Sequence, residues 1–259
     1  MKNNSVSFII VVRNDIFGFS ETFNSIINEV KCEDKLCIVD GSDTSEIIDF
    51  IKNQKDIGGL TISIHQDQKK GVFAAQNMGI KNSENWICVI NSGDILVNGA
   101  RIQIEKAILT NPSVQCHVFS QYAFDKKGFG YRFTPKFDTL WPHQSILLHK
   151  NIYNRFGLYR TDFKYSAEQY FFAIIRKKIP YKIHNQILTN YLLGGLSSKV
   201  NFRHCIEQFR VRRELGKPFF LAIWLSLVSP TLRLITELVL GRRLATKIKL
   251  AIKKNYSSN

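Results

Sequence analysis

The chain has 259 residues, of which 44% are hydrophobic and 22% charged, so it can bury a sizeable core and is not a disordered chain. Its 36 Lys and Arg residues outnumber 21 Asp and Glu residues and give a net charge of +15, which implies an anionic partner such as nucleic acid, anionic lipid or a phosphorylated substrate. The five cysteines are odd in number and match no zinc or CxxC spacing, which argues against a disulfide framework and predicts reduced, buried thiols.

Positive charge is concentrated toward the C-terminus. The segment 200–259 contains 12 Lys and Arg residues and three acids, so +9 of the net charge lies in this part of the chain. The first 199 residues carry the remaining +6. Met1–Ser5 runs directly into an apolar segment, which predicts a protein without a signal peptide, located in the cytoplasm.

The N-terminal half alternates short β-branched apolar runs with segments whose apolar residues recur at helical spacing. Strands are predicted at Ser7–Val12, Lys35–Val39, Thr61–His65, Trp86–Ile90 and Gln115–Phe119, and helices at Ser20–Val30, Ser45–Lys52, Val72–Ile80 and Ala100–Thr110. This alternation with short connections predicts an α/β fold that is Rossmann-like, with a central, mostly parallel sheet flanked by helices.

The second half of the chain is less regular. The aromatic and Gly-rich segment 121–140 is interpreted as loop and edge strand. Further strands are predicted at Ser145–Leu148 and Lys182–Leu193, a helix at Ala167–Arg176, and a basic helix after Arg203.

A polar cluster, Asp40-Gly41-Ser42-Asp43-Thr44, follows the second predicted strand. Ligands of parallel α/β sheets bind at the carboxyl ends of the strands, where an acid can hydrogen-bond a base or ribose and glycine lets the chain turn tightly. A plain Asx or Ser-type turn explains the same residues equally well.

A second cluster, Asn91-Ser92-Gly93-Asp94, closes the strand Trp86–Ile90. A carboxylate beside a glycine at this position suits Mg²⁺ or Mn²⁺ that bridges a diphosphate, because hard divalent ions prefer oxygen ligands. The alternative is that Asp94 is the N-cap of the following helix.

The two clusters occur together, and with their neighbours they resemble a known family. The segments SFIIVVRN, IVDGSDT, GVFAAQNMGI and VINSGD are similar to the N-terminal half of family 2 glycosyltransferases, in particular those of bacterial exopolysaccharide, capsule and O-antigen (colanic-acid-type) synthesis, which have the GT-A fold. Further matches are Pro142-His143-Gln144, Ser166-Ala167-Glu168 and Gly194-Gly195-Leu196-Ser197. The resemblance covers residues 5–200. It implies metal-dependent, inverting transfer of a sugar from a nucleotide diphosphate, with UDP as the commonest nucleotide, to a hydroxyl of a glycan or lipid-linked acceptor.

The resemblance also implies roles for single residues. Asp40 would contact the nucleotide base, and Asp94 would hold Mg²⁺ or Mn²⁺ on the donor diphosphate. Asn77 would lie near the nucleotide or the donor sugar, and Arg13 is likewise assigned to the donor. Glu168 stands where the family has its catalytic base, which removes the proton of the attacking hydroxyl.

The later motifs are assigned to the acceptor or the diphosphate: His143, Gln144, Gly195 and Ser197. The implied organisation is a catalytic domain at 1–200, with a nucleotide-sugar half (1–99) and an acceptor half (100–200), followed by a basic amphipathic tail at 201–259.

The sequence departs from the family pattern at two places. Ala74 stands where the family has Asp, and Gln169 rather than an acid follows Glu168. Asp162 lies close enough in sequence to be an alternative base, and a solvated acid favoured by the helix dipole is the structural alternative for Glu168.

The tail combines an apolar run with a basic cluster. The apolar run Phe219–Val228 is ended by Pro230, and Arg233 and Glu237 interrupt the sequence that follows. The run is too short to span a membrane, which takes about 20 apolar residues. Basic residues follow, from Arg242 to Lys254. This composition is typical of a helix that lies on anionic lipid, so the predicted location is the inner face of the cell membrane; the alternative is a helix packed on the domain.

Three other functions were weighed against sugar transfer. A nucleotidyltransferase also binds a nucleotide on an α/β sheet, but it needs a Gly-rich basic phosphate loop that VVRNDIFGF lacks. Nucleic-acid binding is suggested by charge alone, and lipid explains the basic residues better. A catalytically inactive relative stays open because of Ala74 and because Asn91 stands in place of an acid, although the subgroup that the sequence resembles tolerates Asn at this position.

Overall fold

The structure is a computed structural model that describes residues 4–54, 59–125, 129–137, 141–193 and 202–240. The chain divides into two compact units, Met1–Leu193 and Gly194–Asn259, which are described in turn.

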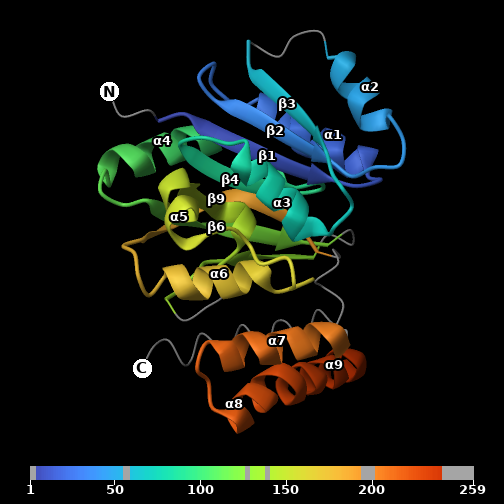
Figure 1. Cartoon of the computed structure of the whole chain (residues 1–259), viewed down its shortest axis with the longest axis vertical. Helices are drawn as coiled ribbons and strands as arrows, with labels where there is room; N and C mark the ends of the chain where they lie inside the picture. Colours follow the sequence, from blue (N-terminus) through green and yellow to red (C-terminus); the bar gives the residue numbers. More distant parts are fainter. Residues whose placement is uncertain (1–3, 55–58, 126–128, 138–140, 194–201, 241–259) are drawn as a thin grey trace. The chain divides into compact units, whose positions relative to one another are not determined.

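The first unit is built on a sheet for which the described residues supply nine strands (Figure 1). The strands are β1 Val6–Val12, β2 Lys35–Asp40, β3 Thr61–Gln66, β4 Trp86–Asn91, β5 Ile95–Leu96, β6 Cys116–Phe124, β7 Gly130–Phe133, β8 Ile146–His149 and β9 Lys182–Leu192. Their order is β3-β2-β1-β4-β8-β6-β9-β5, and β7 pairs with β6. β1, β2, β3 and β4 are mutually parallel, as β6 and β9 are, whereas β8, β7 and β5 pair antiparallel with their neighbours.

The strand order reverses between β1 and β4, because the chain moves from β1 outward to β2 and β3 and then returns to the other side of β1. Ligands of open α/β sheets bind in the crevice that this reversal opens at the carboxyl ends of the strands. The carboxyl ends of β1, β2 and β4 are therefore the place to look for a site.

Helices flank the sheet: α1 Ile16–Ile27, α2 Glu46–Lys52, α3 Val72–Lys81, α4 Ala100–Thr110, α5 Lys150–Phe156 and α6 Ala167–Ile175. Phe8 of β1 packs with Phe19 and Phe23 of α1 in the main apolar core, and each such buried side chain contributes about 2 kcal/mol. Ile9 points to the opposite face, which α3 covers (Figure 1). Gly79 permits this close approach, because a Cβ there would lie 2.4 Å from Ile9 Cγ2.

The predicted α/β fold, with a central sheet flanked by helices, is confirmed, and the differences are local. α1 begins before the predicted Ser20, since Asp15 caps it by accepting a hydrogen bond from the Gly18 N–H at 3.0 Å. β6 extends well beyond the predicted Phe119, and the short β5 and α5 were not predicted at all. Four of the five cysteines are buried and all five are free, as expected.

The second unit contains α7 Phe202–Glu214, α8 Phe219–Ile223, a π-turn Trp224–Val228 and α9 Ser229–Leu240. The helical path continues through Pro230 into α9. The π-turn explains why the helix continues. The Ser229 N–H donates to the Trp224 carbonyl in the wider π pattern, so the regular α-helical hydrogen bonds are already interrupted at the point where Pro230 has no N–H to donate. No helix within the described residues is long and apolar enough to span a bilayer.

Candidate active site

The turn after β4 holds Asp94 at the carboxyl edge of the sheet. Gly93 adopts φ 91°, a left-handed conformation that glycine reaches without strain. Thr22 of α1 fixes the turn, since its Oγ1 accepts from the Gly93 N–H at 3.0 Å and donates to the Asp94 carbonyl at 2.7 Å. The N-cap of α4 is Gly99, so the alternative that Asp94 caps this helix is wrong.

The Asp94 carboxylate is buried, with 4% of the residue exposed. Burial raises its pKa to about 7, against the opposing effects of His143 and of hydrogen bonds from Gln144 and the Leu192 N–H, while Glu168 raises it further. The charge of His143 is the largest of the effects that lower this pKa. Asp94 is thus a buried acid whose ionised form is disfavoured by burial.

His143 and Glu168 form an ion pair at the same edge. His143 begins a short 3-10 turn before β8, and Glu168 lies in the first turn of α6. Their Nδ1 and Oε2 atoms are 2.6 Å apart, with side chains 12% and 20% exposed. Burial opposes protonation of the imidazole, yet Glu168 and the charge of Asp94 outweigh it and raise the pKa of His143.

A chain of hydrogen bonds connects this pair to α3. Asn91 Nδ2 lies 3.0 Å from His143 Nε2, and Gln76 Nε2 donates to Asn91 Oδ1 at 3.2 Å. In the neutral imidazole Nε2 accepts from Asn91 and Nδ1 donates to Glu168; in the imidazolium both nitrogens donate, and the Asn91 amide turns so that its oxygen accepts from Nε2. Both ring nitrogens of His143 are thereby engaged, and the imidazole is held in one orientation. We call this chain the Gln76–Glu168 relay.

Gln76 was not predicted from the sequence as a residue of the site. Its signal was a polar residue in the apolar stripe of the predicted helix, between Phe73 and Ile80, all three of which are buried. A buried polar side chain needs a partner, and here the partner is a residue of the site.

The first polar cluster, after β2, forms a turn. Asp40 is 1% exposed, and its Oδ1 accepts from the Ser42 N–H at 2.8 Å, which is the geometry of an Asx turn. Ser42 Oγ in turn accepts from the Asn14 N–H at 2.9 Å, so the loops after β1 and β2 are joined. Arg13, in the first of these loops, is exposed.

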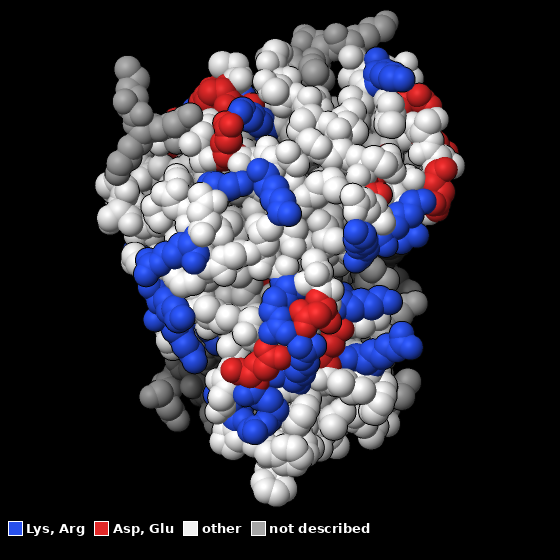
Figure 2. Space-filling model, viewed as in Figure 1, with Lys and Arg blue, Asp and Glu red and all other residues white. Residues whose placement is uncertain are grey.

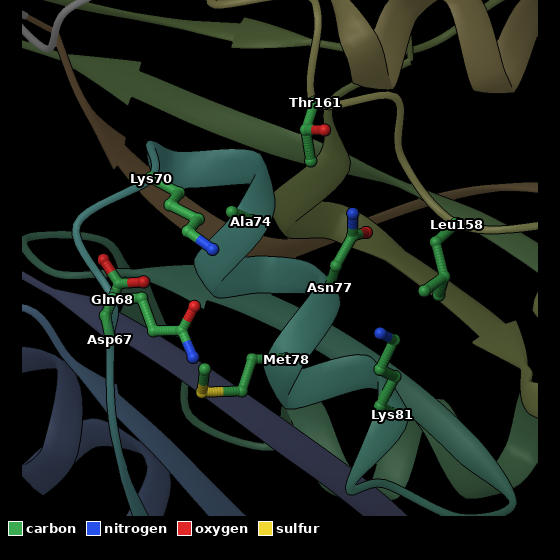
Figure 3. A pocket seen from close by; sticks show the side chains of 9 residues that line it. All are labelled: Asp67, Gln68, Lys70, Ala74, Asn77, Met78, Lys81, Leu158 and Thr161. Atoms are coloured by element: carbon green, nitrogen blue, oxygen red, sulfur yellow. The ribbon is translucent and has the colours of Figure 1, made fainter.

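A pocket of about 300 Å³ lies on the outer face of α3, lined by residues of that helix and by segments 67–70 and 158–161 (Figure 3). Asp67 belongs to its wall and adjoins the Asp40 turn, since the Asp67 N–H donates to the Asp40 carbonyl at 2.7 Å. Ala74 also lines it, so the acid that the family has at this position would have faced the pocket.

Asn77 lines the same pocket, but its amide is committed to the backbone of Tyr159. Oδ1 accepts from the Tyr159 N–H at 2.9 Å, and Nδ2 donates to the Tyr159 carbonyl at 2.7 Å. Asn77 therefore fixes the segment that forms the far wall of the pocket.

The structure thus brings together Asp94, His143, Gln144 and Glu168 from three separate elements. Asp40 and Arg13 lie at the neighbouring ends of β2 and β1. Gly195 and Ser197 lie outside the described residues.

A divalent metal fits this edge of the sheet only if a bound diphosphate supplies further ligands. The described residues contain no group of three or more His, Cys, Asp or Glu side chains that could hold an ion by themselves. Asp94 instead offers one hard oxygen ligand, and because burial raises its pKa to about 7, a bound cation would favour its ionised form. The donor set suits Mg²⁺ or Mn²⁺ held jointly by Asp94 and the oxygens of a bound diphosphate.

Comparison with known families and structures agrees with this geometry. A sequence model described as "Glycosyl transferase family 2" matches residues 7–183, which is more than half of the chain. The protein therefore belongs to glycosyl transferase family 2.

Solved structures share the fold at low sequence identity. S. aureus TarS 1-349 in complex with UDP-GlcNAc has a TM-score of 0.66 at 14% identity, over 85% of this chain and 66% of that chain. The mannosyltransferase PcManGT from Pyrobaculum calidifontis, in complex with GDP-Man and Mn2+, has a TM-score of 0.63 at 11% identity, over 98% and 80%. A longer S. aureus TarS chain is similar over only 39% of its length. Comparison with curated proteins finds no match.

Proposed function

We propose that this protein transfers a sugar, with inversion, from a nucleotide diphosphate donor to a hydroxyl of a glycan or lipid-linked acceptor in surface polysaccharide synthesis. One observation carries the proposal. The acid Glu168, oriented by His143, lies beside the buried acid Asp94 at the carboxyl edge of the sheet. A base for the acceptor and a ligand for the diphosphate are the two acids that a single-displacement transfer requires.

The reaction needs no covalent intermediate. The acceptor oxygen attacks the anomeric carbon while its proton passes to the Glu168 carboxylate. The bond from the anomeric carbon to the phosphate oxygen breaks, and the nucleoside diphosphate leaves with the electron pair. Bound at Asp94, Mg²⁺ or Mn²⁺ would supply positive charge that stabilises this leaving group.

His143 positions the base in this scheme. Its Nδ1–H donates to one oxygen of Glu168 and leaves the other oxygen for the acceptor proton. The Gln76–Glu168 relay restrains the imidazole from the opposite side. Catalytic groups lose efficiency when they are misplaced by even 1 Å, so these supporting bonds matter for the rate.

The nucleotide is assigned to the ends of β1 and β2. Asp40 is fixed there by the Ser42 N–H, which donates to its Oδ1 at 2.8 Å. Arg13 and Lys69 bring positive charge to this turn: the pKa of Asp43 is lowered by hydrogen bonds from Lys69 and Asn14 and, to a smaller extent, by the charge of Arg13. The adjacent pocket at α3, with Asn77 in its wall, extends this region (Figure 3). UDP is the nucleotide that we test first.

The test is calorimetric titration of the protein with UDP-, GDP- and dTDP-sugars, with Mn²⁺ and with EDTA. We expect one nucleotide to bind only when Mn²⁺ is present, and Asp94→Asn to abolish that binding while a control variant, Asp162→Asn, retains it. Equal binding to Asp94→Asn would refute the metal role, and absence of binding by all three nucleotides would refute the donor assignment.

We further propose that the second unit rests on an anionic membrane surface. Its α8 and π-turn expose large apolar side chains, with Phe219 51%, Phe220 84% and Trp224 53% exposed. The surface of α8 is uncharged in Figure 2, whereas basic and acidic side chains lie over α7. An apolar anchor beside basic residues is the composition of an interfacial helix.

Sedimentation with liposomes tests this second proposal. Vesicles that contain phosphatidylglycerol should pellet the protein at low salt better than neutral vesicles do, and Phe220→Ser combined with Trp224→Ser should release it. The control is Ile102→Ser, an equally exposed apolar residue of α4, at 68%. Unchanged sedimentation of the double variant would show that α8 is not the anchor.

A further inference from the structure

One face of the β6–β7 hairpin carries a second pocket, which none of the residues assigned so far lines. Gln121 of β6 stands directly opposite Phe133 of β7, and Tyr131 is two residues from Phe133 and so points to the same face. Together with Trp141 and Pro142, these side chains line a pocket of about 200 Å³. We call it the hairpin pocket.

Two of the residues that line the hairpin pocket each have a buried polar atom without a hydrogen-bond partner among the described residues: Gln121 Oε1, an acceptor, and Trp141 Nε1, a donor. Trp141 is only 6% exposed, and its ring is fixed by Tyr181, at 4.7 Å between ring centroids. A buried polar atom without a partner destabilises the folded chain, so a pair of them at one pocket points to a ligand that supplies the missing bonds.

The chemistry of the wall defines the class of that ligand. None of the five lining residues is charged, and Gln121 Oε1 would repel a phosphate or carboxylate oxygen. The ligand must offer one hydrogen-bond donor and one acceptor a short distance apart, and apolar faces for three aromatic rings. A neutral pyranose meets all three conditions, since each hydroxyl both donates and accepts and the C–H groups of its ring form apolar faces.

The chain connects the hairpin pocket to the proposed base. Pro142 lines the pocket, and the next residue, His143, is paired with Glu168. Two residues span at most about 7 Å, so Trp141 and the His143–Glu168 pair are near neighbours. A sugar in the pocket could therefore place a hydroxyl at the base.

We propose that the hairpin pocket is the acceptor subsite, where a neutral pyranose of the acceptor stacks on the aromatic side chains and bonds Gln121 Oε1 and Trp141 Nε1. This inference rests on the proposed glycosyl transfer, because it assigns the acceptor of that reaction. The acceptor end bound here is a sugar ring rather than a bare lipid or a phosphate.

The indole N–H signals of the protein test the subsite directly. The chain has three tryptophans, and Trp141→Phe identifies the signal of Trp141 in a ¹H–¹⁵N spectrum. The probes are methyl glycosides of glucose, galactose, mannose and N-acetylglucosamine, titrated with and without UDP and Mn²⁺. Sorbitol, which carries similar hydroxyls without a ring, is the control ligand. We expect at least one glycoside to shift the Trp141 signal saturably and sorbitol not to shift it.

A substitution at the other polar atom separates a binding role from a structural one. Gln121→Met keeps the length of the side chain and removes the buried acceptor, so the melting temperature should stay equal or rise while the glycoside binds about tenfold more weakly. Tyr122→Phe is the matched control, since Tyr122 is the next residue of β6, points to the opposite face and is 37% exposed. Should Trp141→Phe fail to fold, Gln121→Met alone still decides the question.

The outcomes separate the subsite from the proposed function. If a nucleotide-sugar binds but no glycoside shifts the Trp141 signal, the subsite is wrong and the transferase proposal stands. If a glycoside binds but no nucleotide does, the pocket is a sugar site and the donor assignment fails. If Gln121→Met lowers the melting temperature and leaves glycoside binding unchanged, Gln121 is structural and the proposal is overturned.

Discussion

The substitution Asp34→Ala tests how the sheet is held at the edge opposite the site. Asp34 precedes β2 and accepts four hydrogen bonds: from Arg101 Nε at 2.7 Å and Nη2 at 3.1 Å, from the Val6 N–H at 2.8 Å and from the Lys31 N–H at 2.9 Å. Arg101 and Asp34 are each 1% exposed, so the pair is buried. It joins the start of β1, the loop before β2 and the first turn of α4.

The expected loss in the free energy of unfolding is large because Arg101 stays buried after Asp34 is removed. Truncation of Asp34 leaves two backbone donors unpaired and leaves the buried guanidinium with the Asn4 carbonyl at 3.2 Å and the partly exposed Glu33 at 3.7 Å. Breaking a buried pair in this way costs about 3–5 kcal/mol. For a chain of this size the melting temperature should fall by about 10 °C. The double substitution Asp34→Leu with Arg101→Met removes both charges, and we expect it to recover part of the loss.

Urea unfolding followed by circular dichroism measures these differences. The control is Glu105→Ala, which breaks the Lys31–Glu105 pair at 2.6 Å; because those side chains are 37% and 32% exposed, the cost should be under about 1 kcal/mol. Donor binding at permissive temperature should be unaffected, since the pair lies at the amino end of β1. If Asp34→Ala loses no more than the control does, the buried pair does not stabilise this fold and the reasoning fails.

Two further predictions concern buried polar groups. Burial and the nearby His184 lower the pKa of His117 to about 4, while the unfolded value is near 6.5, so the folded state excludes a proton that the unfolded state binds. This contribution to stability is complete above pH 6.5 and is lost as the pH falls toward 4, by about 3 kcal/mol for His117 alone. Urea unfolding at pH 7.0, 5.5 and 4.5 measures the loss. The substitution His117→Asn should make the free energy of unfolding depend less on pH. In the relay, Gln76→Met removes a bond and a buried Oε1 that has no partner among the described residues, so stability should change by less than about 1 kcal/mol. The transfer rate of Gln76→Met should nevertheless fall about tenfold at unchanged donor affinity. Recovery of the rate in Gln76→Glu, or a lower donor affinity of Gln76→Met, would contradict the role of the relay.

The parts of the fold that follow from local pattern were predictable from the sequence. Apolar runs and helical spacing locate β1, β2, β3 and β4 within one or two residues. The positions of Asp40 and Asp94 at strand ends follow from the same pattern, since parallel strands share one carboxyl edge.

Long-range pairing was not predictable in the same way. β8 lies between β4 and β6 although it follows β6 in the chain, and no periodicity encodes such an insertion. It is this arrangement that carries His143, just before β8, to Asn91 at the end of β4. The sequence could indicate His143 as a site residue, but not that Asn91 would be its partner.

The hairpin pocket could not be predicted from the sequence for a related reason. The segment 121–140 has no regular alternation of apolar and polar residues, so its register could not be read from the sequence, and it was interpreted as loop and edge strand. Only the pairing of Gln121 with Phe133 puts an amide among aromatic rings. Trp141 lies in no regular element, and its burial depends on contacts with distant residues such as Tyr181.

Single-turnover transfer by Glu168→Gln shows whether Glu168 is the base. The donor is the nucleotide-sugar found by calorimetry, and the acceptor is the methyl glycoside that binds best. General-base catalysis contributes about 10²–10⁴-fold, so Glu168→Gln should transfer at least a hundredfold more slowly at unchanged donor affinity, while Asp162→Asn keeps the wild-type rate. If Glu168→Gln transfers at a rate within tenfold of wild type, or if Asp162→Asn is the variant that loses transfer, Glu168 is not the base.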